Sequence, residues 1–280
     1  THYQTLASVE KAFMLSVKSY FQSIRVCTLT AIAIGLSSAS QLTLAQSIPS
    51  PETLQETLII FNDPTPPSQG SPTGRQRGGA SRGECRKFEG LTALVPDNNS
   101  IVWGQTTSDR PTFWFYLPSP LTAQTPIEFV VQDEDDNYIY KTHFTAPETR
   151  SGLIDIQIPE TIPSLEVGKT YSWTFTVYCD PTPRSDSIFV QGAIQRISLD
   201  AELQNRLEEA DSIDRASLYA ANGIWFEALN TLANRDRTNT DENSIKAAWD
   251  DLLEQANLDS LTEVPFSPCC TAEQQIGDRE

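Results

Sequence analysis

The spacing of apolar residues changes once along this chain, and that change limits what it can fold into. Over residues 85–197, short runs of alternating apolar and polar residues are separated by prolines. A period of two is typical of a strand with one face in a core and one in water, and proline between runs costs no ladder hydrogen bond. These residues therefore predict an immunoglobulin-like antiparallel β-sandwich. The expected strands are 91–95, 101–104, 112–117, 127–132, 138–144, 153–158, 170–179 and 188–197.

After Ser198 the apolar residues follow a helical period. Leu199, Leu203 and Leu207 recur at every fourth position, with Ser198 as the expected N-cap. Three further helices are expected, over 213–222, over 224–234 and from position 241. The last should bury Ile245, Ala248, Trp249, Leu252 and Leu253.

Residues 219–229 resemble the centre of a tetratricopeptide repeat, with Gly223 at the turn between two helices. This resemblance predicts a small TPR-like helical extension over residues 198–262. A single helical pair cannot bury its own apolar face, so it must dock on the sandwich or on another protein.

Residues 1–45 have the pattern of a secretory signal peptide. Lys18 and Arg25 precede an apolar run of roughly 11 residues, and Ala45 ends a small-residue cleavage motif. The run is shorter than the ~20 residues of a spanning helix, and its alternative interpretation is a buried helix of the mature domain. Met14, the only methionine, is a candidate true start. We expect an exported chain without a membrane span, in the periplasm, the cell envelope or the medium.

Two segments lack a folding pattern. Residues 46–84 are rich in Pro, Gly, Ser, Gln and Arg, and residues 263–280 are mostly polar. Such segments bury too little apolar area to offset their ordering entropy. We expect a disordered linker and a flexible tail.

Four cysteines follow the signal segment, and four cysteines allow three pairings. We favour Cys85–Cys179, which bracket the β-rich region; a loop of that length would contribute ~4–5 kcal/mol in the chain-entropy model. The adjacent Cys269 and Cys270 are expected to pair between chains or to remain thiols, because bonding each other demands backbone strain. No spacing typical of zinc sites accompanies them.

The formal net charge of −17 disfavours nucleic acid as a partner, since an acidic surface repels phosphates. The acidic turn at Asp133, Asp135 and Asp136 is a candidate Ca²⁺ site, because Ca²⁺ prefers several oxygen ligands. The same residues also suit a solvated hairpin tip that discourages edge pairing. No other cofactor is expected.

Catalytic motifs are absent from the sequence. The one histidine after the signal segment, His143, lies in a predicted strand without a neighbouring nucleophile. Paired carboxylates remain an alternative, because their spacing is set in space rather than along the chain.

Aromatic residues are the stronger lead to a binding site. Residues 113–116 place large rings on both faces of one strand. Either Trp114 and Tyr116 or Phe113 and Phe115 would then form an exposed face, unless the C-terminal helices cover it; Trp114 and Tyr116 are the candidate binding residues. Trp225, in the helical unit, is the third candidate binding residue.

Several motifs resemble one family, the domain of unknown function 928, a largely cyanobacterial family of exported proteins. They are the segments 91–96, 111–118, 171–181, 190–196, 219–229 and 247–253, within a resemblance of about residues 85–260. The resemblance implies export and no established activity or catalytic residue.

Together these features favour a non-enzymatic protein-interaction module of the periplasm or cell envelope. The alternatives are a carbohydrate or cell-wall binding module that uses the strand aromatics, and a hydrolase with an unrecognised carboxylate site.

Overall fold

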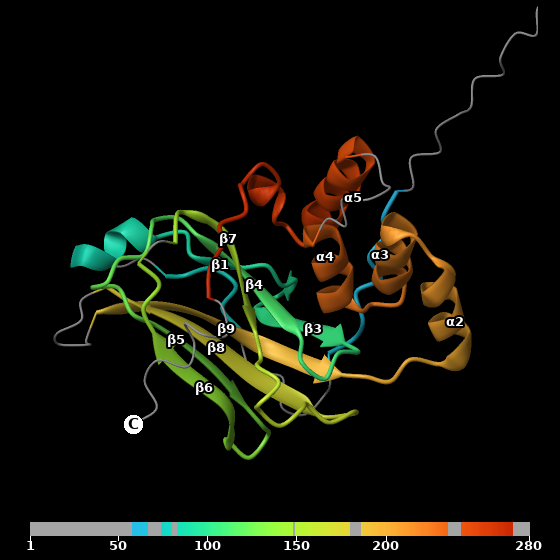
Figure 1. The fold of residues 1–280 in the computed structure, drawn as a ribbon, viewed down its shortest axis with the longest axis horizontal. Helices are drawn as coiled ribbons and strands as arrows, with labels where there is room; N and C mark the ends of the chain where they lie inside the picture. The colour runs from blue at the N-terminus through green and yellow to red at the C-terminus, as the bar shows by residue number, and fades with distance from the viewer. Residues whose placement is uncertain are drawn as a thin grey trace, which may run out of the picture. The chain divides into compact units, whose positions relative to one another are not determined.

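Alternating runs form the strands of two β-sheets in the computed structural model of the chain (Figure 1). The structure describes residues 58–66, 74–79, 83–147, 149–179, 186–234 and 242–270, which all lie in the unit Leu54–Glu280. The strands are β1 (Thr92–Ala93), β2 (Asp97–Asn98), β3 (Ile101–Thr106), β4 (Thr112–Leu117), β5 (Ile127–Gln132), β6 (Tyr138–Phe144), β7 (Gly152–Gln157), β8 (Thr170–Tyr178) and β9 (Ser187–Arg196).

The smaller sheet has the order β1-β4-β7 and the larger the order β2-β3-β9-β8-β5-β6. Every pair is antiparallel except β3 and β9, which run parallel. The prediction of an all-antiparallel body is therefore wrong at this pair. β3 and β9 are separated by most of the β region, so no hairpin dictates their relative direction.

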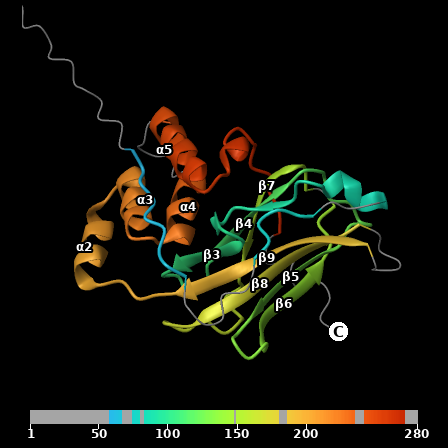
Figure 2. The ribbon, with the colours of Figure 1, turned by 180° about the vertical axis from the view of Figure 1, so that it is seen from behind.

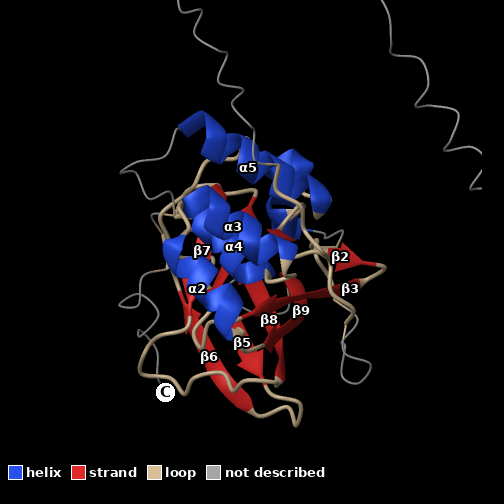
Figure 3. Cartoon of the chain, turned by 90° about the vertical axis from the view of Figure 1, so that its right-hand side faces the viewer, coloured by secondary structure: helices blue, strands red, loops and turns tan. Residues whose placement is uncertain are grey.

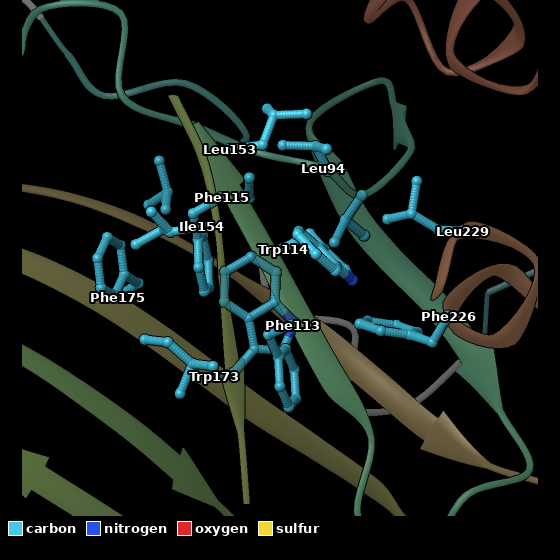
Figure 4. Packing of buried hydrophobic residues seen from close by; sticks show 14 of the residues in the cluster. Leu94, Phe113, Trp114, Phe115, Leu153, Ile154, Trp173, Phe175, Phe226 and Leu229 are labelled. Carbon is cyan, nitrogen blue, oxygen red and sulfur yellow. The ribbon is translucent and has the colours of Figure 1, made fainter. Parts of the chain in front are cut away.

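Aromatic side chains fill the space between the two sheets (Figure 4). Phe115 of β4 stacks on Phe175 of β8 with ring centroids 4.3 Å apart, and Phe113 lies 4.9 Å from Phe129 of β5. All four rings are almost completely buried. These contacts follow from the period-two pattern, which turns the alternate residues of each strand toward the opposite sheet.

The chain after β9 is helical, as the 3.6-residue period predicts. A 3₁₀ turn, η1 (Gly83–Phe88), precedes the strands; after them come α2 (Ala201–Glu209), α3 (Ser212–Ala221), α4 (Trp225–Ala233), α5 (Glu242–Gln255) and η2 (Asp259–Leu261). The predicted N-cap Ser198 is wrong: Asp200 caps α2 by accepting the backbone N–H of Leu203 at 2.7 Å. α3 ends before Gly223, whose φ of 73° suits glycine. The fold is thus mainly β with a C-terminal helical part.

The helices gather on one side of the sheets (Figure 3). Helix α4 packs on β3 and β4. A Cβ added to Gly104 of β3 would lie 3.1 Å from the ring of Phe226, so glycine lets α4 pack tightly on this strand. Trp225 is fully buried and donates its indole N–H to the carbonyl of Leu94 at 2.8 Å. Helices α3, α4 and α5 share one hydrophobic core with the β body, whereas the buried leucines of α2 form a separate small cluster with Ile224.

Two stretches of the predicted disordered linker pack on the body. Ile59 is 1% exposed and joins the core, and residues 58–66 run beside α3 (Figure 2). Arg75 exchanges two backbone hydrogen bonds with Gln191 of β9, while Arg77 bridges Thr92 of β1. The stretch 74–79 thereby connects the two sheets, and these backbone bonds supply the stabilisation that composition alone did not predict. The remainder of the linker prediction, like the signal segment 1–45, lies outside the described residues.

The start of the predicted flexible tail also differs from the expectation. Phe266 packs edge-on against Trp114 and lies 5.5 Å from Trp249 of α5. Leu153 of β7 donates its backbone N–H to Pro265 at 2.9 Å and accepts the N–H of residue 267 at 2.8 Å. An inserted aromatic ring and two strand-like hydrogen bonds fix this segment. Residues 271–280 lie outside the described part.

Two disulfides occur among the described residues. Cys85 and Cys179 are bonded, with their Cα atoms 5.1 Å apart, which confirms the favoured pair. The expectation for the other pair is wrong, because Cys269 and Cys270 bond each other. Cys270 takes a left-handed φ of 64°. The backbone therefore adopts the uncommon conformation that had argued against a bond between adjacent cysteines. None of the helices in the described ranges is long and apolar enough to cross a membrane.

Candidate functional site

A polar pocket of about 280 Å³ lies where the helices meet the β body. We call it the junction pocket. The β3–β4 connection and the start of β4 form one wall, the end of β7 adds a side chain, and α3 and α4 form the other wall. Its lining residues are Ser108, Arg110, Pro111, Thr112, Gln157, Arg215, Tyr219, Phe226, Glu227, Asn230 and Thr231.

Glu227 connects the two walls of the junction pocket. It is the third residue of α4, and its Oε1 accepts three hydrogen bonds from the end of β3 and the β3–β4 connection that follows. The donors are the hydroxyl of Thr106 at 2.6 Å and the backbone N–H groups of Thr107 and Ser108 at 3.0 and 2.8 Å. This carboxyl group therefore holds the connection against the helix.

The second oxygen of Glu227, Oε2, accepts none of these hydrogen bonds. Part of the residue stays accessible, but Oε2 is buried and has no hydrogen-bond partner among the described residues. Burial raises the pKa of Glu227 above its ordinary value, and the bonds to Thr106, Ser108 and Thr107 counteract that rise only in part. Glu227 thus lines the pocket and carries one oxygen whose hydrogen-bonding capacity is unused within the described residues.

Arg110 forms the opposite part of the wall. Its guanidinium donates to Asp109 at 2.9 Å and to the carbonyls of Ile162 and Glu160 at 3.1 and 3.2 Å. Its Nε is buried and lacks a partner within the described ranges. Arg110 lines the pocket with its guanidinium group fixed in place, because its other nitrogens are already held.

Arg215 and Tyr219 extend the pocket along α3. Arg215 donates to the carbonyls of Leu207 and Ala210 at 3.1 and 2.8 Å, which ties the end of α2 to α3. Burial raises the pKa of the Tyr219 hydroxyl, with a further rise from the charge of Glu227 and a decrease from Arg215. Tyr219 therefore stays a neutral donor and acceptor at physiological pH.

The three predicted binding residues do not form an exposed aromatic face. Trp114 is only 6% exposed; its indole N–H donates to Asn230 of α4 at 3.2 Å and Phe266 covers its ring. Trp225 is fully buried and Tyr116 is half-buried against the core. The alternative in which the helices cover this face therefore describes the structure, and Trp114 and Trp225 are core residues.

The predicted metal residues are not brought together as ligands. Oδ1 of Asp133 accepts the backbone N–H groups of Asp135 and Asn137 at 3.0 and 2.9 Å, and its Oδ2 accepts the amide of Asn137 at 3.0 Å. These bonds, with the Asn137 side chain first, lower the pKa of Asp133. No group of three or more potential metal ligands occurs in the described ranges. The residues serve the tight β5–β6 turn, in which Asp136 has a φ of 62°.

Neither His143 nor a pair of carboxylates forms a catalytic arrangement at the junction pocket. His143 lies on β6 and packs near Tyr178, with ring centroids 5.7 Å apart. Glu227 is the one carboxylate among the residues that line the pocket. Glycoside hydrolysis needs a second carboxyl group within about 5–10 Å on the other side of the scissile bond.

The junction pocket is not predictable from the sequence by motif or local pattern. Its walls come from segments more than a hundred positions apart, and no motif connects them. The one available signal was Glu227 itself, a carboxylate between Phe226 and Ala228 in a largely apolar helix. A charged residue at a buried helical position has to find a partner elsewhere in the fold.

Fold and site together define a class of protein: two β-sheets covered on one side by C-terminal helices, with a polar pocket where the helices meet the sheets. Within that class, residues 77–266 match the family model described as Domain of Unknown Function (DUF928). The match covers more than half of the 280-residue chain, so the chain belongs to this family. No curated protein and no solved structure matches the chain.

Proposed function

We propose that this chain is an exported, non-enzymatic binding module that contacts a component of the periplasm or cell envelope through the junction pocket. The observation that carries the proposal is Glu227, which is held by three hydrogen bonds on one oxygen and leaves the other buried and unpartnered beside the pocket. An unsatisfied buried polar atom costs about 1–3 kcal/mol. Such an arrangement suits a site that is completed by a ligand.

Export is supported by the disulfides and by the signal-like segment. Disulfides persist in oxidising compartments, and both pairs of cysteines after the signal segment are bonded. N-terminal sequencing of the protein recovered from the envelope fraction tests export, and a mature chain that begins after Ala45 is the expected result. A chain that starts before this residue contradicts the predicted signal peptide.

The finer description of the fold belongs to the same proposal. Two facing sheets with an aromatic core support an immunoglobulin-like sandwich, although β3 and β9 pair in parallel. The antiparallel succession of α3 and α4 around Gly223 supports a TPR-like pair, used here to dock on the body. Docking in the same chain leaves the pocket, rather than the apolar helix face, as the contact point for a partner.

A binding assay with a blocked pocket tests the proposal. Gln157 is exposed at the end of β7 and lines the pocket, so Gln157→Trp fills the pocket without disturbing the core. Gln124, exposed in the β4–β5 loop and absent from the lining, provides the matched control Gln124→Trp. Immobilised protein is exposed to envelope fractions, and we expect capture to fall at least tenfold only for the pocket variant.

The same assay separates a protein partner from a glycan. Treatment of the envelope fraction with protease removes a protein partner, whereas treatment with glycan hydrolases removes a wall component. Equal capture by Gln157→Trp and Gln124→Trp would show that the pocket is not the binding site.

A further inference from the structure

The lining of the junction pocket is unusually rich in hydrogen-bonding groups for its volume. Of its lining residues, all except Pro111 and Phe226 carry a hydroxyl, amide, guanidinium or carboxyl group. Small-molecule sites are mostly apolar and occupy about 300–1,000 Å³, and this pocket of about 280 Å³ lies at the lower limit of that range. Its ligand must therefore be small and must itself carry many donors and acceptors.

The charges at the pocket balance, which indicates a neutral ligand. Arg110 is paired with Asp109, and Arg215 and Glu227 carry opposite charges on the α3 and α4 wall. An anion would meet the carboxyl group of Glu227 and the acidic surface of the chain, whereas a cation would meet two guanidinium groups. A neutral ligand encounters neither repulsion.

Two buried side-chain atoms of the lining residues, Nε of Arg110 and Oε2 of Glu227, differ in hydrogen-bonding capacity. Nε–H of Arg110 is a donor, and Oε2 of Glu227 accepts when ionised and donates when protonated. The three bonds to Oε1 fix the orientation of the carboxyl group, so a ligand gains access to Oε2 where the neighbouring side chains of the pocket shift rather than where the carboxyl group turns. A hydroxyl group is chemically matched to both atoms and to either form of the carboxyl group, because it both donates and accepts.

A peptide amide satisfies these groups less well than a polyol. One amide offers a single acceptor oxygen and at most two N–H donors, whereas a sugar ring presents several hydroxyl groups around one small ring. The half-buried ring of Tyr219 adds a surface for the apolar face of such a ring.

From these observations we propose that the junction pocket binds one neutral sugar residue of an envelope glycan, with Glu227 and Arg110 contacting its hydroxyl groups. The inference rests on the proposed function, since it names the ligand class of the same pocket. It differs from binding through the strand aromatics, because Trp114 and Trp225 are buried.

Nuclear magnetic resonance titration of the full protein tests the ligand class. The probes are glucose and N-acetylglucosamine as sugars, and N-acetyl-glycyl-glycinamide as the amide, each at millimolar concentration. We expect saturable shifts with at least one sugar, abolished in Gln157→Trp and unchanged in Gln124→Trp. Glu227→Gln keeps an oxygen for the three donors but replaces Oε2 with an NH₂ group, and we expect sugar affinity to change by about tenfold.

The outcomes separate this inference from the proposed function. Saturation by the amide probe alone overturns the sugar class but leaves pocket binding intact. If neither sugar binds while envelope capture still depends on Gln157, the sugar class is equally overturned and the binding function stands. Sugar binding that persists in Gln157→Trp overturns the pocket assignment, and loss of pocket dependence in both assays overturns both proposals.

Discussion

Two carboxylates of this protein, Asp133 in the β5–β6 turn and Glu227 at the junction of helix and sheet, have opposite environments. Asp133 is at an exposed turn, with both oxygens partnered by the turn itself and its pKa lowered. Glu227 has one oxygen with three partners and one with none among the described residues, and burial raises its pKa. A cluster of acidic residues along the sequence proved to be a self-sufficient turn. The group available for a ligand is an isolated acid in an apolar helix.

The largest expected difference between the two regions is in stability. Trp225→Ala at the junction should lower the free energy of unfolding by about 3–5 kcal/mol, because it removes a fully buried indole and its bond to Leu94. Tyr138→Ala, beside the turn and 60% exposed, should change it by about 0.5 kcal/mol or less. Urea unfolding curves measure both, and comparable costs would mean that the helical part does not share the core.

A second test concerns the carboxyl group itself. Glu227→Ala leaves three donors at the end of β3 and in the β3–β4 connection without this acceptor and should cost about 2–3 kcal/mol. Glu227→Gln retains an acceptor oxygen and should cost less than about 1 kcal/mol. Thermal unfolding distinguishes the two variants, and equal losses would contradict the assigned hydrogen bonds.

The pH dependence should have opposite signs in the two regions. The lowered pKa of Asp133 stabilises the fold above the ordinary aspartate pKa, and this contribution is lost as the pH falls through the lowered value. The raised pKa of Glu227 does the reverse: folding stability decreases as the pH rises from the ordinary glutamate pKa through the raised value.

The variants Asp133→Asn and Glu227→Gln isolate these two contributions. Relative to the original chain, Glu227→Gln should gain stability as the pH rises, and Asp133→Asn should lose it. Unfolding curves from acidic to neutral pH measure the difference in unfolding free energy between each variant and the original chain. If this difference changes with pH in the same direction for both variants, the two carboxyl groups do not have opposite environments.

The smallest expected effect is that of calcium. Asp133 already uses its oxygens for the turn, so millimolar Ca²⁺ should produce no heat in a calorimetric titration and no change in Tm. Glu227→Gln serves as a control far from the turn in sequence. A saturable heat that disappears in Asp133→Asn would restore the calcium site.

Much of the β body was predictable from local pattern. The expected strands 112–117, 127–132 and 138–144 coincide with β4, β5 and β6, and the five apolar residues expected to be buried in the last helix are buried. Local rules failed where a contact came from far along the chain. Arg75 pairs with Gln191 and Phe266 with Trp114, and neither segment has a pattern of its own.

The sequence by itself determined which faces of the strands and helices are apolar, where turns fall and which two distant cysteines bracket the body, because each depends on residue type and short-range spacing. Only the tertiary structure decided that β3 runs parallel to β9, that α4 covers Trp114, and that Glu227 meets Ser108 where the helices meet the sheets. Those relations depend on which surfaces exclude water together. The burial of one Glu227 oxygen, its missing hydrogen-bond partner and the raised pKa of the group all result from this packing.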